Sequence, residues 1–143
     1  MAVRLRPYLA FADNGAEVMA YYADVFGGSL NMMKYGDFPM ELPFTPPADA
    51  LAHAHLDSGD VQITGGDAVM CQDQQSRSLA SQTYSFLLEA DSIGEATALI
   101  DKFSATGGTV TMPFEKAPWG DHYGQVTDRY GVLWAFNVAA ANT

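Results

Sequence analysis

The chain has 143 residues, of which 48% are hydrophobic and 17% charged, so it can bury the core of one domain and does not belong to the disordered class. Its formal net charge is −10, from 17 acidic and 7 basic side chains that are scattered along the sequence, which excludes the clustered Lys and Arg of a nucleic-acid-binding protein. No apolar run approaches the roughly 20 residues of a membrane span, and no signal peptide is recognised, so we expect a cytoplasmic protein without a membrane partner. Cys71 is the only cysteine, which excludes an internal disulfide and a cysteine-based zinc site.

The beginning of the chain predicts a strand followed by a helix. Residues 5–12 form an apolar run, and Asn14 with Glu17 three positions later is typical of a helix N-terminus. Apolar side chains then recur every four residues and form one stripe, at Val18, Tyr22 and Phe26. Two consecutive glycines at positions 27 and 28 predict the end of the helix, which we place at Gly15–Phe26.

The same order of signals returns in the second half of the chain. A strand-like run at residues 83–90 precedes Ser92 and Glu95, and glycines 107 and 108 follow a helix that we place at Ile93–Ala105. The two cap residues, Asn14 and Ser92, are 78 residues apart. This spacing indicates an internal repeat.

Three further strands are predicted after each glycine pair. In the first half they lie at residues 29–35, 51–56 and 61–64, and in the second half at residues 109–114, 124–127 and 132–138. Each half is therefore βαβββ, over about residues 3–66 and 82–140. Because one helix covers only one face of a sheet, we expect one α+β domain, residues 1–143, whose curved, mostly antiparallel sheet surrounds a cleft. Open sheet edges favour a homodimer.

Short segments that carry a family resemblance lie along nearly the whole chain. They are Pro7-Tyr8-Leu9, Val25-Phe26-Gly27-Gly28, Tyr35-Gly36-Asp37, His53-Ala54, Met112-Pro113, Trp119-Gly120 and Thr127-Asp128-Arg129. With these segments the chain resembles the vicinal oxygen chelate superfamily, which includes glyoxalase I, extradiol dioxygenases and bleomycin-resistance proteins. The similarity is greatest to its PhnB-like branch, sometimes labelled a 3-demethylubiquinone methyltransferase domain. No glycine-rich loop is present to hold S-adenosylmethionine, so we do not expect methyl transfer.

The resemblance implies four metal-ligand positions, one on each of four strands. They fall on Pro7, on His53 or His55, near Ser85, and on Ala135. Proline and alanine side chains have no donor atom, and a catalytic divalent ion normally holds at least three protein ligands. We therefore expect no metal and no cofactor.

Two histidines are the main candidates for ligand contact. His53 and His55 are spaced i, i+2 on a predicted strand, so both imidazoles point to one face, which we expect to be concave. Either ring could bind a ligand carbonyl, and His53 is the candidate general base. The alternative is that one or both are hydrogen-bonded structural residues.

Other candidate ligand-binding residues lie in loops and near strand ends. They are Tyr35, Ser85, Trp119, His122 and Tyr123. Phe38 and Met40 extend the Tyr35 segment and would form an apolar lid or a subunit contact. Trp119 would stack on a planar ligand or pack in a core or dimer interface. We assign Tyr8, Tyr22, Phe26, Ile93 and Trp134 to the core, and Asp128-Arg129 to a surface turn with an ion pair.

The sequence thus predicts a small-molecule-binding protein whose cleft does not use the superfamily's metal. One alternative is a glyoxalase-like, metal-dependent lyase or dioxygenase. A further alternative is sequestration without catalysis, in which an acidic protein traps a cationic drug. Whether a reaction is catalysed stays open, because catalysis needs a positioned acid or base whereas sequestration needs only shape and charge.

Overall fold

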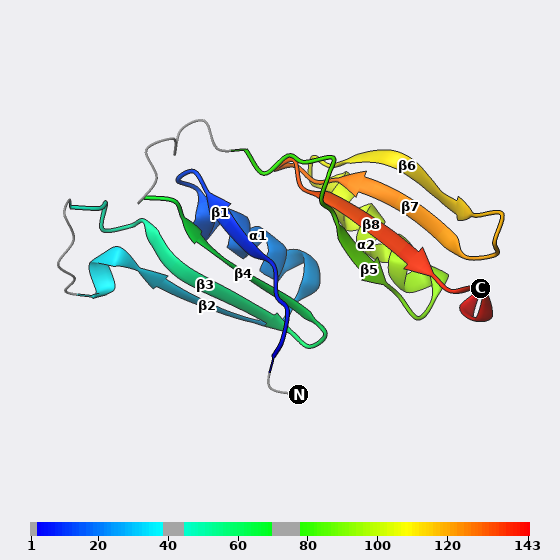
Figure 1. Ribbon diagram of the computed structural model, residues 1–143, viewed down its shortest axis with the longest axis horizontal. Coiled ribbons are helices and arrows are strands. Elements are labelled where there is room, and N and C mark those ends of the chain that lie inside the picture. The colour runs from blue at the N-terminus through cyan, green and yellow to red at the C-terminus, as the bar shows by residue number, and fades with distance from the viewer. Residues whose placement is uncertain (1–2, 39–44, 70–77) are drawn as a thin grey trace. The chain divides into compact units, whose positions relative to one another are not determined.

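The computed structural model describes residues 3–38, 45–69 and 78–143, and the chain divides into two compact units, Met1–Leu79 and Ala80–Thr143. Each unit contains a four-stranded sheet with one helix across one face (Figure 1). Met40 and Cys71, which were considered above, lie outside the described residues.

The N-terminal unit contains β1 (Tyr8–Phe11), α1 (Gly15–Phe26), β2 (Ser29–Lys34), the 3-10 turn η1 (Tyr35–Asp37), β3 (Leu51–Ser58) and β4 (Val61–Asp67). Its strand order is β1-β4-β3-β2. The β1–β4 pair is parallel, and the other two pairs are antiparallel.

The C-terminal unit repeats this arrangement with β5 (Phe86–Glu89), α2 (Ile93–Ala105), β6 (Thr109–Lys116), β7 (His122–Thr127), β8 (Leu133–Val138) and the 3-10 turn η3 (Ala140–Asn142). Its strand order is β5-β8-β7-β6, again with one parallel pair, β5–β8. Both predicted helices and the repeated βαβββ order are therefore confirmed. No helix among the described residues is long and apolar enough to cross a membrane.

Each core lies between the helix and the sheet face that it covers. On β3 and β4 the side chains of Ala54, Leu56 and Ile63 are buried beneath α1, and Val18 and Tyr22 of that helix are fully buried. In the C-terminal unit, Trp134 stacks on Phe103 of α2 with ring centroids 5.5 Å apart. Because strand side chains alternate between faces, the other face of each sheet is left open within its own unit.

The two helices begin in different ways. The Ser92 side chain accepts a hydrogen bond from the Glu95 amide (3.1 Å), so the predicted cap of α2 is confirmed. The Asn14 side chain makes no capping bond. The first amide of α1, that of Gly15, instead donates to the buried carboxylate of Asp67 at 2.9 Å, and Asp67 also accepts from the Leu51 amide at 2.8 Å. A residue 52 positions later thus supplies the N-terminal acceptor.

Four of the proposed core and surface assignments differ in the structure. Tyr8 is 57% exposed, because it lies on the open face of β1 rather than beneath α1. Phe26 and Ile93 are half-buried, whereas Tyr22 and Trp134 are core residues as predicted. The prediction that Asp128 lies at the surface was wrong: the residue is 4% exposed, and its carboxylate accepts three hydrogen bonds within its own hairpin.

Candidate functional site

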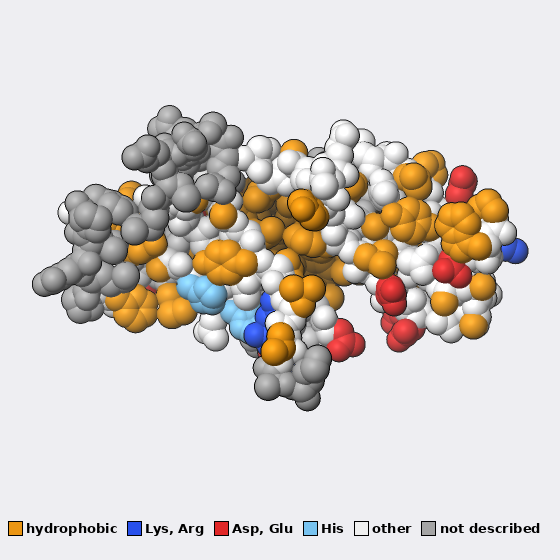
Figure 2. Space-filling model, in the orientation of Figure 1, with side chains coloured by type: hydrophobic (Ala, Val, Ile, Leu, Met, Phe, Trp, Pro, Cys, Tyr) orange, Lys and Arg blue, Asp and Glu red, His pale blue; other side chains and the backbone are white. Residues whose placement is uncertain are grey.

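The open face of the N-terminal sheet carries both histidines. Ala54 and Leu56 point toward α1, so the alternation of β3 places His53 and His55 together on the opposite face, as predicted. Both rings are partly exposed, and Figure 2 shows histidine side chains at the surface of this unit.

His55 belongs to a row of hydrogen-bonded polar groups. Its Nε2 lies 2.6 Å from Oε1 of Gln62 on β4, and Nε2 of Gln62 donates to Oδ1 of Asp57 at 2.5 Å and to the Gly59 carbonyl oxygen at 2.7 Å. Because the Gln62 amide group is oriented by these two acceptors, its oxygen faces His55, whose Nε2 must carry the hydrogen. The Nδ1 atom of His55 is then the acceptor in the neutral ring.

The Asp57 carboxylate at the end of this row is stabilised in its charged form. The pKa of Asp57 is lowered, first by the hydrogen bond from Gln62 and then by the Gly59 amide, against a smaller opposing effect of desolvation; Arg6, and His55 when it is protonated, add weaker attraction. It therefore stays ionised at neutral pH and keeps the Gln62 amide group turned toward it.

His53 is positioned by aromatic stacking. Its ring lies against Tyr8 of β1, with centroids 5.9 Å apart and planes 28° from parallel. The Tyr8 hydroxyl passes so close to Gly66 that a Cβ there would lie 2.8 Å from it. Burial and the neighbouring Tyr35 raise the pKa of Tyr8, so its phenol stays protonated and available as a donor at neutral pH.

The open face of the C-terminal sheet carries a second polar row. Tyr123, Gln125 and Thr127 alternate along β7 with the buried Gly124 and Val126, so they share the face opposite α2. Gln125 Nε2 donates to the Tyr123 hydroxyl at 3.1 Å.

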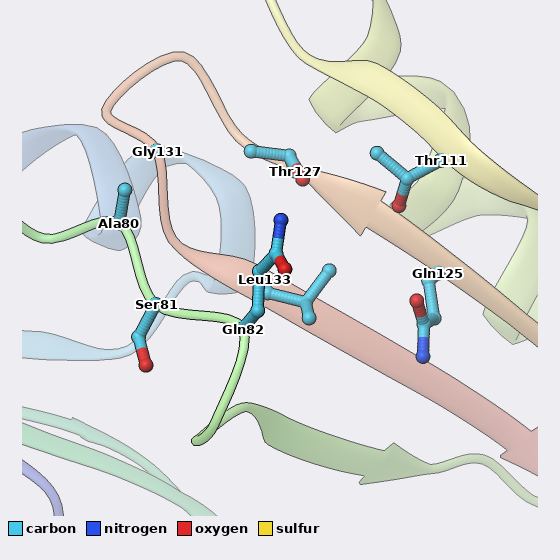
Figure 3. Close-up of a pocket in the computed structure, with 8 residues that line it drawn as sticks. All are labelled: Ala80, Ser81, Gln82, Thr111, Gln125, Thr127, Gly131 and Leu133. Carbon is cyan, nitrogen blue, oxygen red and sulfur yellow. The ribbon is translucent and has the colours of Figure 1, made fainter.

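Beside this row lies a cavity of about 440 Å3. Its lining comes from β6, β7, β8, the β7–β8 turn and the segment before β5 (Figure 3), namely Ala80, Ser81, Gln82, Thr111, Gln125, Thr127, Gly131 and Leu133. None of these side chains is charged. This volume lies within the range of small-molecule sites.

The other predicted ligand-binding residues are dispersed. Ser85 is exposed directly before β5, and Tyr35 begins η1 near Tyr8. Trp119 is 71% exposed in the β6–β7 turn. The cavity residue Thr127 lies at the other end of the same hairpin. By strand alternation His122 faces the helix side of its sheet, where its ring lies 5.6 Å from that of Phe114.

The donor atoms present do not fit the metal of the resembled superfamily. Pro7 contributes only its carbonyl oxygen, which already accepts from the Thr64 amide (3.1 Å) and hydroxyl (2.6 Å). Ala135 is buried and has no donor. Across residues 3–38, 45–69 and 78–143, no three His, Cys, Asp or Glu side chains are grouped as metal ligands would be.

Sequence reasoning missed the amide side chains. Gln62 orients His55, and Gln125 lines the cavity, yet neither was a candidate. The signal was present for Gln125, because the i, i+2 spacing from Tyr123 places both on one strand face. Gln62 follows a turn, and its role depends on the pairing of β3 with β4.

Comparison with known proteins gives concordant matches. The model of the Glyoxalase/Bleomycin resistance protein/Dioxygenase superfamily matches residues 4–136. Protein YjdN of Escherichia coli (strain K12) is 28% identical over 144 residues, covering 94% of each chain. The structure of protein PA1353 from Pseudomonas aeruginosa is 30% identical, with a TM-score of 0.75 over 96% of this chain and 98% of that one. A putative 3-demethylubiquinone-9 3-methyltransferase, PhnB protein, from Bacillus cereus shares the fold, at 18% identity and TM-score 0.69 over 96% of this chain and all of that one.

Proposed function

The chain belongs to the Glyoxalase/Bleomycin resistance protein/Dioxygenase superfamily, and we propose that it binds a small organic molecule through side chains on the open faces of its sheets, without the superfamily's metal. One observation carries this proposal: hydrogen-bonding side chains gather on the sheet faces opposite the helices, and neighbours fix their orientation. Pre-oriented polar groups beside apolar surface are characteristic of small-molecule sites.

On the N-terminal sheet we assign ligand contact to both histidines. The His53 ring makes no hydrogen bond within the described part of the chain, so both of its nitrogens are available to a ligand, and it is the candidate proton acceptor. His55 offers Nδ1, because Nε2 is engaged with Gln62. The protonated phenol of Tyr8 adds a donor beside His53.

The proposal predicts binding that does not depend on a divalent ion. A thermal-shift screen of small aromatic and polar metabolites should find compounds that raise the melting temperature. They should raise it equally with and without EDTA, because Pro7 and Ala135 leave too few ligands for a catalytic metal. Elemental analysis should find well under one metal per chain. About one zinc, nickel or iron per chain, with binding lost in EDTA, would favour the metal-dependent lyase or dioxygenase instead.

We also propose that the protein is a cytoplasmic homodimer. The edge strands β2 and β6 expose apolar side chains, with Met32 and Met33 39% exposed and Val110 and Met112 44% exposed. Exposed strand edges of this kind favour pairing with a second copy. Light scattering should therefore give twice the chain mass of 15.4 kDa, and Met112→Lys should shift the mass toward one chain if β6 forms the contact. A wild-type mass of one chain at micromolar concentration would contradict the dimer.

A further inference from the structure

The cavity of the C-terminal unit is lined by uncharged groups only. Four polar side chains remain available for a ligand: Gln82, Thr111, Gln125 and Thr127. Ser81 is already engaged, because its Oγ accepts from the Thr83 and Tyr84 amides at 3.2 Å each, and Figure 3 shows its oxygen pointing away from the other lining side chains. Leu133 adds an apolar surface.

A hydrogen bond to Tyr123 orients the Gln125 amide in the structure. Its Nε2 donates to the Tyr123 hydroxyl, two residues earlier on the same strand face. A side-chain amide has its donor group on one side and its acceptor on the other, so this bond turns Oε1 away from Tyr123. In Figure 3 that oxygen points toward Thr111, on the cavity side, and the nitrogen points away.

The neighbouring strand β6 brings a hydroxyl to the same place. Val110 pairs with Val126, whose side chain is buried on the helix side, so by alternation the next residue, Thr111, belongs to the open face that carries Gln125. Figure 3 shows the Thr111 hydroxyl facing the Gln125 oxygen.

The lining offers no counter-charge to an ion of either sign, because none of its side chains is charged. A bound carboxylate would meet the Gln125 oxygen without any lining cation, in a chain of net charge −10. We propose that this cavity takes an uncharged ligand, such as a primary amide, whose N–H group donates to Gln125 Oε1. This inference rests on the proposed function of small-molecule binding, and it names the ligand class of one site.

Three compounds with the same ring test the inference on the full-length protein: benzamide, its N,N-dimethyl derivative, which has no donor, and benzoate, which is charged. Dissociation constants are measured from 15N–1H spectra, using the backbone amides of Thr111 and Thr127 and the side-chain amide of Gln125. Benzamide should bind at the cavity, about fivefold or more tighter than either analogue, since one neutral hydrogen bond is worth roughly 1 kcal/mol.

Two variants assign the preference to the proposed atoms. In Gln125→Leu, benzamide and its dimethyl derivative should bind equally, because the acceptor is gone. In Tyr123→Phe, benzoate should gain relative to benzamide, because the freed amide can turn its nitrogen into the cavity. The matched control is Thr97→Leu, a polar-to-leucine change on the exposed surface of α2, which should leave the preference of the wild type unchanged.

Three results would overturn the inference: tighter binding of benzoate than of benzamide, a preference that survives in Gln125→Leu, or no benzamide binding at about 20 mM. None of them touches the proposed function by itself. That function fails separately, if no compound in the thermal-shift screen binds either sheet.

Discussion

Replacing Asp128 with alanine should lower the free energy of unfolding by about 3–5 kcal/mol. The carboxylate is buried in the turn between β7 and β8, where Oδ1 accepts from the amides of Tyr130 (2.8 Å) and Val132 (3.1 Å), and Oδ2 accepts from the Trp134 indole at 2.9 Å. Alanine leaves these donors without that acceptor, and each unsatisfied buried donor costs about 1–3 kcal/mol. The lost hydrogen bonds also connect the turn to the core, because the Trp134 side chain stacks on Phe103 of α2.

The melting temperature of Asp128→Ala should fall by about 10 °C in differential scanning calorimetry. Asp128→Asn should recover only part of this, since all three contacts are donors and the amide places a fourth donor among them. The control is Asp101→Ala on the exposed surface of α2, which should stay within about 0.5 kcal/mol of the wild type. Equal melting temperatures for Asp128→Ala and this control would mean that the hydrogen bonds contribute nothing net.

The regular elements were predictable because their signals are local. The stripe at Val18, Tyr22 and Phe26 and the glycines after it lie within one helix, and the predicted bounds of α1 and α2 match the structure. Ser92 caps α2 from the position next to it. A pattern with a period of 3.6 or 2 requires no knowledge of the tertiary fold.

The buried carboxylates were not predictable, because their partners are set by tertiary structure. Asn14 has the sequence signature of a cap, yet Asp67 reaches the first amide of α1 through the pairing of β4 with β1. Asp128 stands in an Asp-Arg-Tyr-Gly turn that reads like an exposed loop. Only the position of Trp134 below the turn shows that this carboxylate is enclosed.

The candidate site was predictable only to the level of strand faces. Alternation placed His53 and His55 together, and the structure keeps them on the open face of β3. The same rule assigns Tyr123 to the open face of β7 and His122 to the opposite one, although both were candidates. The cavity beside Gln125 depends on the pairing of β6 with β7, which places Thr111 beside it, and on residues 80–82, whose position no local pattern indicates.

Truncating His53 should separate a ligand contact from a structural role. We expect His53→Ala to weaken a compound found in the thermal-shift screen by about 10- to 100-fold, because a hydrogen bond from a ligand to an imidazole is worth roughly 1–3 kcal/mol when truncated. The melting temperature of the free protein should change by no more than about 2 °C, since the ring is partly exposed and its described contact is stacking on Tyr8.

His55→Ala provides the matched comparison on the same strand face. It removes the partner of Gln62 Oε1, so it should lower the melting temperature by several degrees as well as weaken binding. The two variants should thus differ as their contacts predict: His53→Ala should lower ligand affinity alone, whereas His55→Ala should lower both ligand affinity and the melting temperature. A fall of several degrees for His53→Ala with titrations equal to the wild type would show that its imidazole is structural, and would place the ligand away from this face of β3.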